Sequence, residues 1–289
     1  MKTIDTLVDD IMAVVDGHGG WDKAVNEYFT GTIGETLWSR VGDDKKEHPK
    51  GTLRMSSIGQ PCERKLWYSI HQHEDSAPLP PEAKLKFLYG DILEDLLLAL
   101  AVAAGHTVEG HQDTMTLCGI KGHRDAVIDG VTVDVKSASP YAFTKFQKGL
   151  TAEEDAFGYL TQLPSYIKAA EDDPLVTDKT GGAFLVIDKV HGKLCLDYRD
   201  FEKSGHLDDV EDLINSRKAS CADGDTVPPR GFPTEADGKS GNRKLGVNCS
   251  YCDFKRTCYP DLRAFKYYKG PVFLTKVERE PNVPEIPLD

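Results

Sequence analysis

Two apolar runs joined by an Asp-Gly pair constrain the fold of this chain more than any other feature. Residues 121–128 and 131–137 flank Asp129 and Gly130, the dipeptide most typical of a two-residue β-hairpin turn. In the second run, VTVDVKS, valines alternate with a threonine, an aspartate and a lysine. Because successive side chains of a strand point to opposite faces, we expect the valines on one face and the polar side chains on the other.

The turn also predicts which residues of the two strands lie opposite each other. Counting back from it places Asp125 opposite Asp134, and His123 opposite Lys136, unless a bulge shifts the register. Two carboxylates that face each other on a sheet repel, and a divalent cation between them removes the conflict. The pattern therefore predicts a Mg²⁺ or Mn²⁺ site with a lysine beside it, a set of groups suited to phosphodiester hydrolysis. The alternative is a surface ion pair between Asp134 and Lys136.

The rest of the chain predicts an α/β fold. Residues 1–48 indicate two helices and an acidic, polar loop. Further helices are expected at residues 63–70, 84–104, 141–170 (interrupted near residue 149) and 207–219, and further strands at 107–118, 183–190 and 193–198. This order predicts a mixed β-sheet flanked by helices. The apolar residues of 84–104 surround the helix almost completely, which predicts burial on most of its faces.

Composition narrows the class of protein. The chain has 289 residues and a net charge of −12, which by itself argues against a nucleic-acid partner. A carboxylate site contributes to that charge, however, and a local basic groove can coexist with it. No apolar run is long enough to span a membrane and no signal peptide is recognised, so we expect a cytoplasmic protein without a membrane partner.

Three closely spaced cysteines indicate a metal centre. The chain has 7 cysteines, and without an export signal a disulfide framework is not expected. NCSYCDFKRTC brings Cys249, Cys252 and Cys258 close together, a spacing typical of zinc or iron–sulfur ligands. A fourth thiol must come from elsewhere, and the residues alone leave several candidates: Cys62, Cys118, Cys195 and Cys221.

Four short motifs resemble those of one nuclease superfamily. GHRDAVIDG followed by VDVKSAS is similar to motifs II and III of the PD-(D/E)xK nucleases, and in particular of the RecB-like group. YGDILEDLL resembles the helical motif that precedes the sheet, and YLTQLPSYI resembles the Q-x-x-x-Y motif of the helix that follows it. Each motif is loose, but the four occur in the expected order over about residues 56–260. The resemblance implies a restriction-endonuclease-like core.

The resemblance also implies roles for individual residues. The divalent metal would be bound by carboxylates and one backbone carbonyl: Glu94, Asp125, Asp134 and Val135. Lys136 would activate or position water, and Gln162 would orient the phosphate or a catalytic side chain. Tyr166 and Arg64 would contact DNA. Asp91 and Asp95 compete with Glu94, but the distance from Gly90 favours Glu94; Tyr159 is expected to be a packing residue and His123 a structural one.

The cysteines extend the resemblance to nucleases of the AddB type and to CRISPR-associated nucleases similar to them. PCERKLWY, followed much later by CSYCDFKRTCYP, matches their pattern of one cysteine before the core and three after it. This implies a [4Fe–4S] cluster on Cys62, Cys249, Cys252 and Cys258 that staples the N- and C-terminal segments together. Zinc bound to the same thiols is the alternative.

Together these patterns predict a metal-dependent DNA exonuclease of recombination, repair or phage DNA processing, in the host cytoplasm if phage-encoded. Its partner would be linear DNA, single- or double-stranded, with a recombination protein as a possible second partner. The expected segments are 1–55 (helical), 56–262 (nuclease core with the staple) and 263–289 (C-terminal tail). The alternatives are a structure-specific or CRISPR-adaptation-type endonuclease, a non-catalytic iron–sulfur DNA-binding or decoy protein, and a zinc-ribbon interaction protein.

Overall fold

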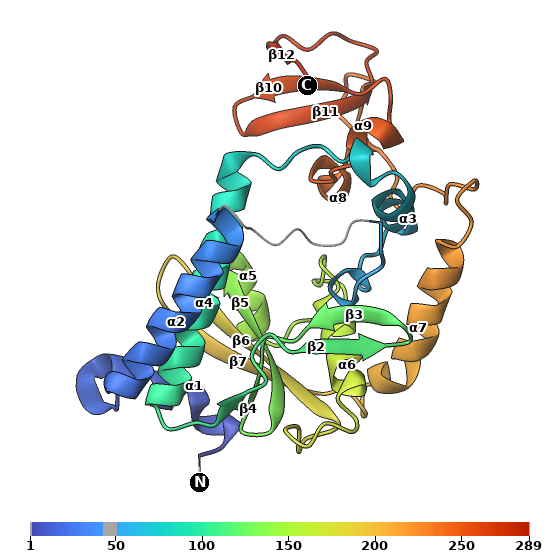
Figure 1. The fold of residues 1–289 in the computed structure, drawn as a ribbon. Coiled ribbons are helices and arrows are strands. Elements are labelled where there is room, and N and C mark those ends of the chain that lie inside the picture. Colours follow the sequence, from blue (N-terminus) through green and yellow to red (C-terminus); the bar gives the residue numbers. More distant parts are fainter. Residues whose placement is uncertain (1, 43–50, 289) are drawn as a thin grey trace. The chain divides into compact units, whose positions relative to one another are not determined.

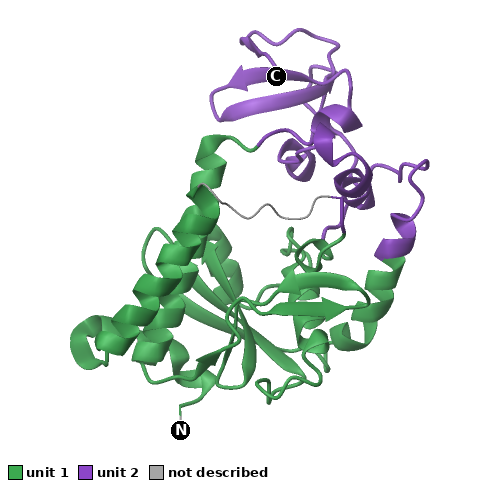
Figure 2. Ribbon diagram, viewed as in Figure 1, with its two compact units in different colours: residues 1–48, 53–59, 79–216 green, residues 49–52, 60–78, 217–289 purple. Residues whose placement is uncertain are grey.

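The computed structural model describes residues 2–42 and 51–288 and divides the chain into two compact units (Figure 2). Unit 1 comprises residues 1–48, 53–59 and 79–216, and unit 2 comprises residues 49–52, 60–78 and 217–289. These units are not the three consecutive segments expected from the sequence, because the chain passes between them several times. The acidic, polar loop predicted at the end of residues 1–48 lies outside the described residues.

A mixed five-stranded sheet forms the centre of unit 1, in the order β1-β4-β5-β6-β7 (Figure 1). Its strands are β1 (Val108–Glu109), β4 (Ala126–Ile128), β5 (Val131–Ala138), β6 (Gly181–Asp188) and β7 (Leu194–Asp200). Strands β5 and β6 are parallel, and the other neighbours are antiparallel. The predicted mixed sheet with flanking helices is therefore confirmed.

Helices cover both faces of this sheet. They are α1 (Leu7–Ala13), α4 (Pro81–Ala103), α5 (Pro140–Gln147) and α6 (Tyr159–Ala169). Helix α2 (Lys23–Val41) packs on α4, and α7 (His206–Ser220) contributes Val210 and Ile214 to a separate buried cluster. The valines of β5 pack against α1 and α4 on one face, while Phe184 and Val186 of β6 pack against α5 and α6 on the other. Since α2 runs alongside α4 (Figure 1), the second half of α4 is covered on two sides, as its leucines and alanines predict, whereas Leu85, Phe87 and Tyr89 of its first half are exposed.

No helix in the described part of the chain has the length and apolar composition needed to cross a membrane.

The predicted hairpin between β4 and β5 is confirmed. Asp129 and Gly130 have φ angles of 51° and 81°, the left-handed conformation that a type I′ turn requires of both central residues. The register is the predicted one over the length of β4: Ile128 opposite Val131, Val127 opposite Thr132 and Ala126 opposite Val133. The alternation therefore puts Asp134 and Lys136 on the face of β5 opposite to its valines.

The strand predicted at residues 121–128 is in fact two strands. Strand β3 (Ile120–His123) pairs with β2 (Thr114–Leu117) in a separate two-stranded sheet, so His123 lies opposite Thr114 and not opposite Lys136. The chain turns at Arg124, whose side chain is 1% exposed. Its guanidinium binds the carboxylates of Asp113 and Asp173 at 2.7 and 2.6 Å. The buried Arg124 side chain and its two ion pairs thus lie where the predicted strand is interrupted.

The described part of unit 2 contains three short α-helices, a 3-10 helix (His73–Asp75), the end of α7 and a second sheet. The helices are α3 (Glu63–His71), α8 (Val247–Ser250) and α9 (Lys255–Cys258). The sheet has the order β12-β10-β11-β9-β8, with β8 (Glu235–Ala236), β9 (Arg243–Lys244), β10 (Arg263–Tyr267), β11 (Gly270–Lys276) and β12 (Glu285–Ile286). Residues 263–289, predicted as a tail, thus contribute three strands to it.

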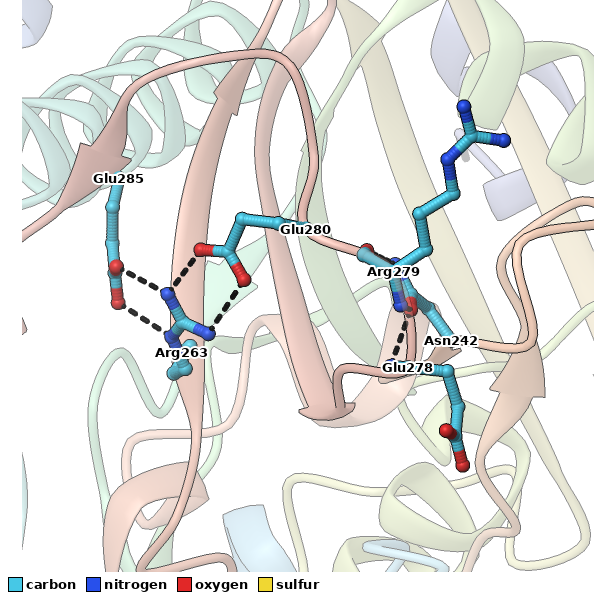
Figure 3. A network of polar contacts seen from close by, with 6 residues as sticks. All are labelled: Asn242, Arg263, Glu278, Arg279, Glu280 and Glu285. Atoms are coloured by element: carbon cyan, nitrogen blue, oxygen red, sulfur yellow. Dashed lines mark hydrogen bonds and ion pairs between the residues drawn. The ribbon is translucent and has the colours of Figure 1, made fainter.

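Polar contacts hold the last strands of unit 2 in place (Figure 3). The guanidinium of Arg263 on β10 binds Glu280 and Glu285, each at 2.6 Å. The side-chain carbonyl of Asn242 accepts hydrogen bonds from the backbone N–H groups of Glu278 and Arg279 at 2.7 and 2.9 Å. These contacts order a proline-containing segment whose local sequence gives little indication of structure.

Candidate active site and four-cysteine pocket

Asp125 lies directly before β4 and continues the contact with β5 through its side chain. Its Oδ2 accepts a hydrogen bond from the backbone N–H of Val135 at 2.7 Å, so its carboxylate lies beside the residue that follows Asp134. Burial, followed by the charges of Glu94 and Asp134, raises the pKa of Asp125 well above its usual range. The carboxyl groups of Glu94 on α4 and Asp134 on β5 therefore both repel that of Asp125.

Asp134 and Lys136 form a close ion pair on the same face of β5. Asp134 is 5% exposed, and its Oδ2 lies 2.6 Å from the Nζ of Lys136. Burial alone would lower the pKa of Lys136, but the charges of Asp134 and Asp125 outweigh it, so that the pKa is raised. The ammonium group of Lys136 therefore keeps its proton at neutral pH.

Glu94 is the acid of α4 that acts on Asp125. Asp91 forms an ion pair with an arginine of α2, and the buried Asp95 accepts a hydrogen bond from a threonine of α2 at 2.7 Å. The side chain of Glu94 is 17% exposed, and its charge is the largest electrostatic cause of the raised pKa of Asp125. Of the three acids considered from the sequence, Glu94 thus has the electrostatic link to Asp125.

A loop that sequence reasoning did not single out reaches Glu94. The side-chain amide of Gln112 donates a hydrogen bond to Glu94 Oε1 at 2.7 Å, and Nε2 of His111 lies 3.7 Å from the same oxygen. The nearby carboxylate of Glu94 raises the pKa of His111. The loop exists because Gly110 and Gln112 have positive φ angles, which interrupt the strand predicted at residues 107–118. Gly110 was the one residue whose type could have predicted this turn from the sequence.

Helix α6 supplies three aromatic or amide side chains to the site. Tyr159 was expected to be a packing residue, but besides packing on Phe184 its ring lies 4.9 Å from the Nζ of Lys136. Tyr166 is 3% exposed, and burial raises its pKa to about 12 despite a hydrogen bond with Gln162. The DNA contact expected of Tyr166 stays a prediction, since little of its surface is accessible.

The four cysteines implied by the resemblance line one pocket of unit 2: Cys62, Cys249, Cys252 and Cys258. Burial and the charges of the other three thiols raise the pKa of Cys249 to about 11. A Cβ atom on Gly231 would approach the Sγ of Cys62 to 3.0 Å, so this backbone lies close against the pocket. Cys118, Cys195 and Cys221 do not line it.

Positive side chains surround the thiols. Nη1 of Arg64 lies 3.8 Å from the Sγ of Cys258, and Lys255 donates to the carbonyl of Cys252. Lys65 also lowers the pKa of the Cys252 thiol, although burial raises it overall. Arg64, predicted to contact DNA, thus lines the cysteine pocket, where positive charge stabilises thiolates.

Neither site holds a ready-made coordination geometry: within residues 2–42 and 51–288, no three His, Cys, Asp or Glu side chains are arranged to bind a metal ion. The donor chemistry of the two sites is nevertheless distinct. Carboxylate oxygens suit Mg²⁺ and Mn²⁺, whereas four thiols suit an iron–sulfur cluster or zinc. Each donor set fits the group that the sequence predicts for it.

Comparisons with known proteins add little to these observations. No protein-family model matches the sequence, and no curated protein matches it. Among solved structures, one titled "Crystal structure of SSO0001" is similar, with 16% sequence identity and a TM-score of 0.37 over 82% of this chain and 96% of that chain. A similarity this weak does not bear on function, so the interpretation depends on the site residues themselves.

Proposed function

We propose that the chain is a divalent-metal-dependent DNA exonuclease with a restriction-endonuclease-like core in unit 1. One observation carries the proposal. Asp125 is half-buried, its pKa is raised by burial and then by the charges of Glu94 and Asp134, and Lys136 lies 2.6 Å from Asp134. Such repulsion among carboxylates is costly in a protein without a cation to relieve it, and the order of the four sequence motifs supports the same assignment.

The acidic residues and the lysine would have different roles. Glu94, Asp125 and Asp134 would hold the cation, together with the backbone carbonyl of Val135. When bound, the cation would supply a Lewis acid and lower the pKa of a coordinated water. The ammonium group of Lys136, next to Asp134, would act as a donor to the phosphate or would activate or position the attacking water.

The helix behind the site would support these groups. The ring of Tyr159 lies under the ammonium of Lys136, a cation–π contact that fixes the direction of the lysine. Gln162, partly exposed on the same helix, would orient the phosphate or a catalytic side chain.

The test is digestion of end-labelled linear DNA, single- and double-stranded, beside a closed circle, with Mg²⁺ or Mn²⁺ and then with EDTA. Metal-dependent loss of linear DNA with a spared circle supports an exonuclease. Cleavage of the circle points to a structure-specific or adaptation-type endonuclease. If no substrate is cleaved by folded protein with its cysteine site loaded, the chain is a binding or decoy protein.

Matched lysine variants make the test specific to the site. Lys136→Ala should abolish cleavage and leave the fold intact, as judged by circular dichroism. Lys203→Ala is the control, because this lysine is 84% exposed and forms an ordinary surface ion pair with Asp200. Equal activity of the two variants would remove Lys136 from the mechanism.

For the cysteine pocket we propose a structural [4Fe–4S] cluster. The four thiols, their positive surroundings and the lack of a histidine among the residues lining the pocket support this choice. Anaerobically purified protein should be brown and contain iron and acid-labile sulfide. Colourless protein with stoichiometric zinc would assign the pocket to zinc instead.

A further inference from the structure

An exposed aromatic ring lies at the outer end of a series of contacts that begins at Lys136. Phe157 is 72% exposed. Its ring lies 5.5 Å from that of Tyr159, with an interplanar angle of 30°, and the Tyr159 ring in turn lies 4.9 Å from the Nζ of Lys136. A single exposed phenylalanine is ordinary on a protein surface. This one, however, lies one ring away from the lysine of the candidate active site.

The segment that presents Phe157 is held in place on both sides. The carboxylate of Asp155 accepts hydrogen bonds from the N–H groups of Gly158, Tyr159 and Leu160 at 2.9, 3.0 and 2.8 Å. The backbone of Gly158 also lies so close to Gly59 that a Cβ atom on either would overlap the other. Phe157 is therefore a preorganised ring and not part of a freely moving loop.

A second exposed ring and a cation adjoin the same segment. The Nζ of Lys145 donates a hydrogen bond to the carbonyl of Glu154 at 3.1 Å and lies 4.9 Å from the ring of Tyr141, which is 77% exposed. Aromatic rings interleaved with a cation are typical of surfaces that bind single-stranded nucleic acid. Exposed Glu153 and Glu154 on the same loop offset the positive charge, so the rings and not net charge are the attractive feature.

We infer that Phe157 is a stacking platform for an unpaired nucleobase of the DNA strand whose phosphate lies at Lys136. This inference rests on the proposed function, since it takes DNA as the substrate. A flat π face binds any base with little sequence preference. The bases of an intact duplex are already stacked on one another, so the platform selects single-stranded DNA or a frayed end.

The experiment uses the full chain in EDTA and again in Ca²⁺, with a single-stranded oligonucleotide that carries 2-aminopurine. Binding is read from fluorescence at low and high salt. Phe157→Leu keeps an apolar side chain but removes the ring, and it should weaken binding by about five- to 150-fold. Phe157→Tyr should bind like the wild type. Because stacking is not an ionic contact, the loss should be the same at both salt concentrations, unlike a phosphate contact.

Two comparisons make the result specific. Trp21→Leu removes another exposed ring of unit 1 and should leave binding unchanged. Gly20, the residue before Trp21, lies against the backbone carbonyl of Ala103, about 13 Å along α4 from Glu94. A blunt duplex should be bound equally by the wild type and Phe157→Leu, because its bases are not free to stack on the protein.

The outcomes separate this inference from the proposed function. If the wild type cleaves DNA but Phe157→Leu binds single strands as tightly as the wild type, the inference is wrong and the nuclease stands. Suppose instead that the wild type cleaves no DNA, and that Phe157→Leu loses binding while Phe157→Tyr and Trp21→Leu keep it. The protein is then a DNA-binding protein without nuclease activity, and the role of Phe157 in stacking is supported. An oligonucleotide whose fluorescence does not change with wild-type protein in either solution also overturns it.

Discussion

At the residue scale, the repulsion among three carboxyl groups has a measurable cost. The pKa of Asp125 is higher in the folded chain than its ordinary value, so the folded state binds the proton more tightly than the unfolded state. The stability from this group is fully present below the unfolded-state pKa of about 3.9 and is lost as the pH rises through the folded-state pKa. Above that range, the charge of Asp125 destabilises the metal-free protein.

Asp125→Asn should therefore stabilise the metal-free protein at neutral pH. The amide keeps an oxygen that can accept the Val135 N–H but carries no charge. We expect a gain on the order of 1 kcal/mol, equivalent to roughly 2–4 °C in Tm, measured by thermal unfolding in EDTA. Mn²⁺ should raise the Tm of the wild type but not of the variant. A variant that is less stable in EDTA would contradict this account.

A second residue-scale prediction concerns Arg124, the residue directly before Asp125. Its guanidinium is buried between two carboxylates and also donates to the carbonyl of Gly110. Arg124→Met leaves these acceptors without their partner and should cost on the order of 3 kcal/mol in urea unfolding. It should also weaken Mn²⁺ binding, because Asp125 is the next residue.

The control for Arg124 is Arg40→Met. Arg40 forms an exposed ion pair with Asp91, and such pairs contribute about 0–1 kcal/mol. Comparable losses in the two variants would show that burial of Arg124 has no special part in positioning Asp125.

At the element scale, α6 depends on a close approach of two glycines. A Cβ atom on Gly158 would lie 2.2 Å from the carbonyl oxygen of Gly59. Gly192 is the matched control: its φ of +68° resembles the +76° of Gly158, but nothing lies within 4 Å of its Cβ position. Gly192→Ala should lose about 1–2 kcal/mol from the left-handed backbone alone.

Gly158→Ala should lose more stability than this control, because the added methyl also collides with Gly59. The shift moves Tyr159 and Gln162 at the start of α6, and the rate of DNA cleavage should fall by as much as about 100-fold. Unfolding curves and single-turnover cleavage measure the two effects. Equal behaviour of the two alanine variants would mean that the contact with Gly59 is unimportant.

The same elements show which features of the site could be predicted from the sequence and which could not. The β4–β5 hairpin and its register follow from a local turn signal and strict alternation, so Asp134 and Lys136 could be placed on one face. The interruption at Arg124 could not be foreseen, because the partner Asp173 lies far along the chain. His111 and Gln112 were missed for a related reason: their loop is defined by its contact with Glu94 on another element.

At the scale of the whole molecule, the features that the sequence did not predict again depend on long-range contacts. The last residues contribute β12 because Ile286 pairs with Ala264 and Glu285 binds Arg263. Local sequence there contains prolines and few apolar residues, which explains the prediction of a tail. The cysteine pocket was anticipated only through resemblance, since spacing alone left four candidates for the fourth thiol.

Unit 2 is assembled from separate chain segments, and this makes its stability depend on what the cysteines bind. Cys62 belongs to residues 60–78 and the other three thiols to residues 217–289. A group bound to all four would close a very long loop, which restricts the unfolded chain strongly. Unit 1 has its own buried clusters on both faces of its sheet. The two units should therefore respond differently when that group is lost.

Cys62→Ser should release the bound group and expose unit 2 to protease while unit 1 persists as a resistant core. Limited proteolysis with mass spectrometry would locate the cuts, and thermal unfolding should change from one transition to two. Cys221→Ala is the control: this thiol is buried in unit 2 but does not line the pocket, so the bound group and the protease resistance should remain. Simultaneous digestion of both units in Cys62→Ser would mean that the cysteine group stabilises the entire chain.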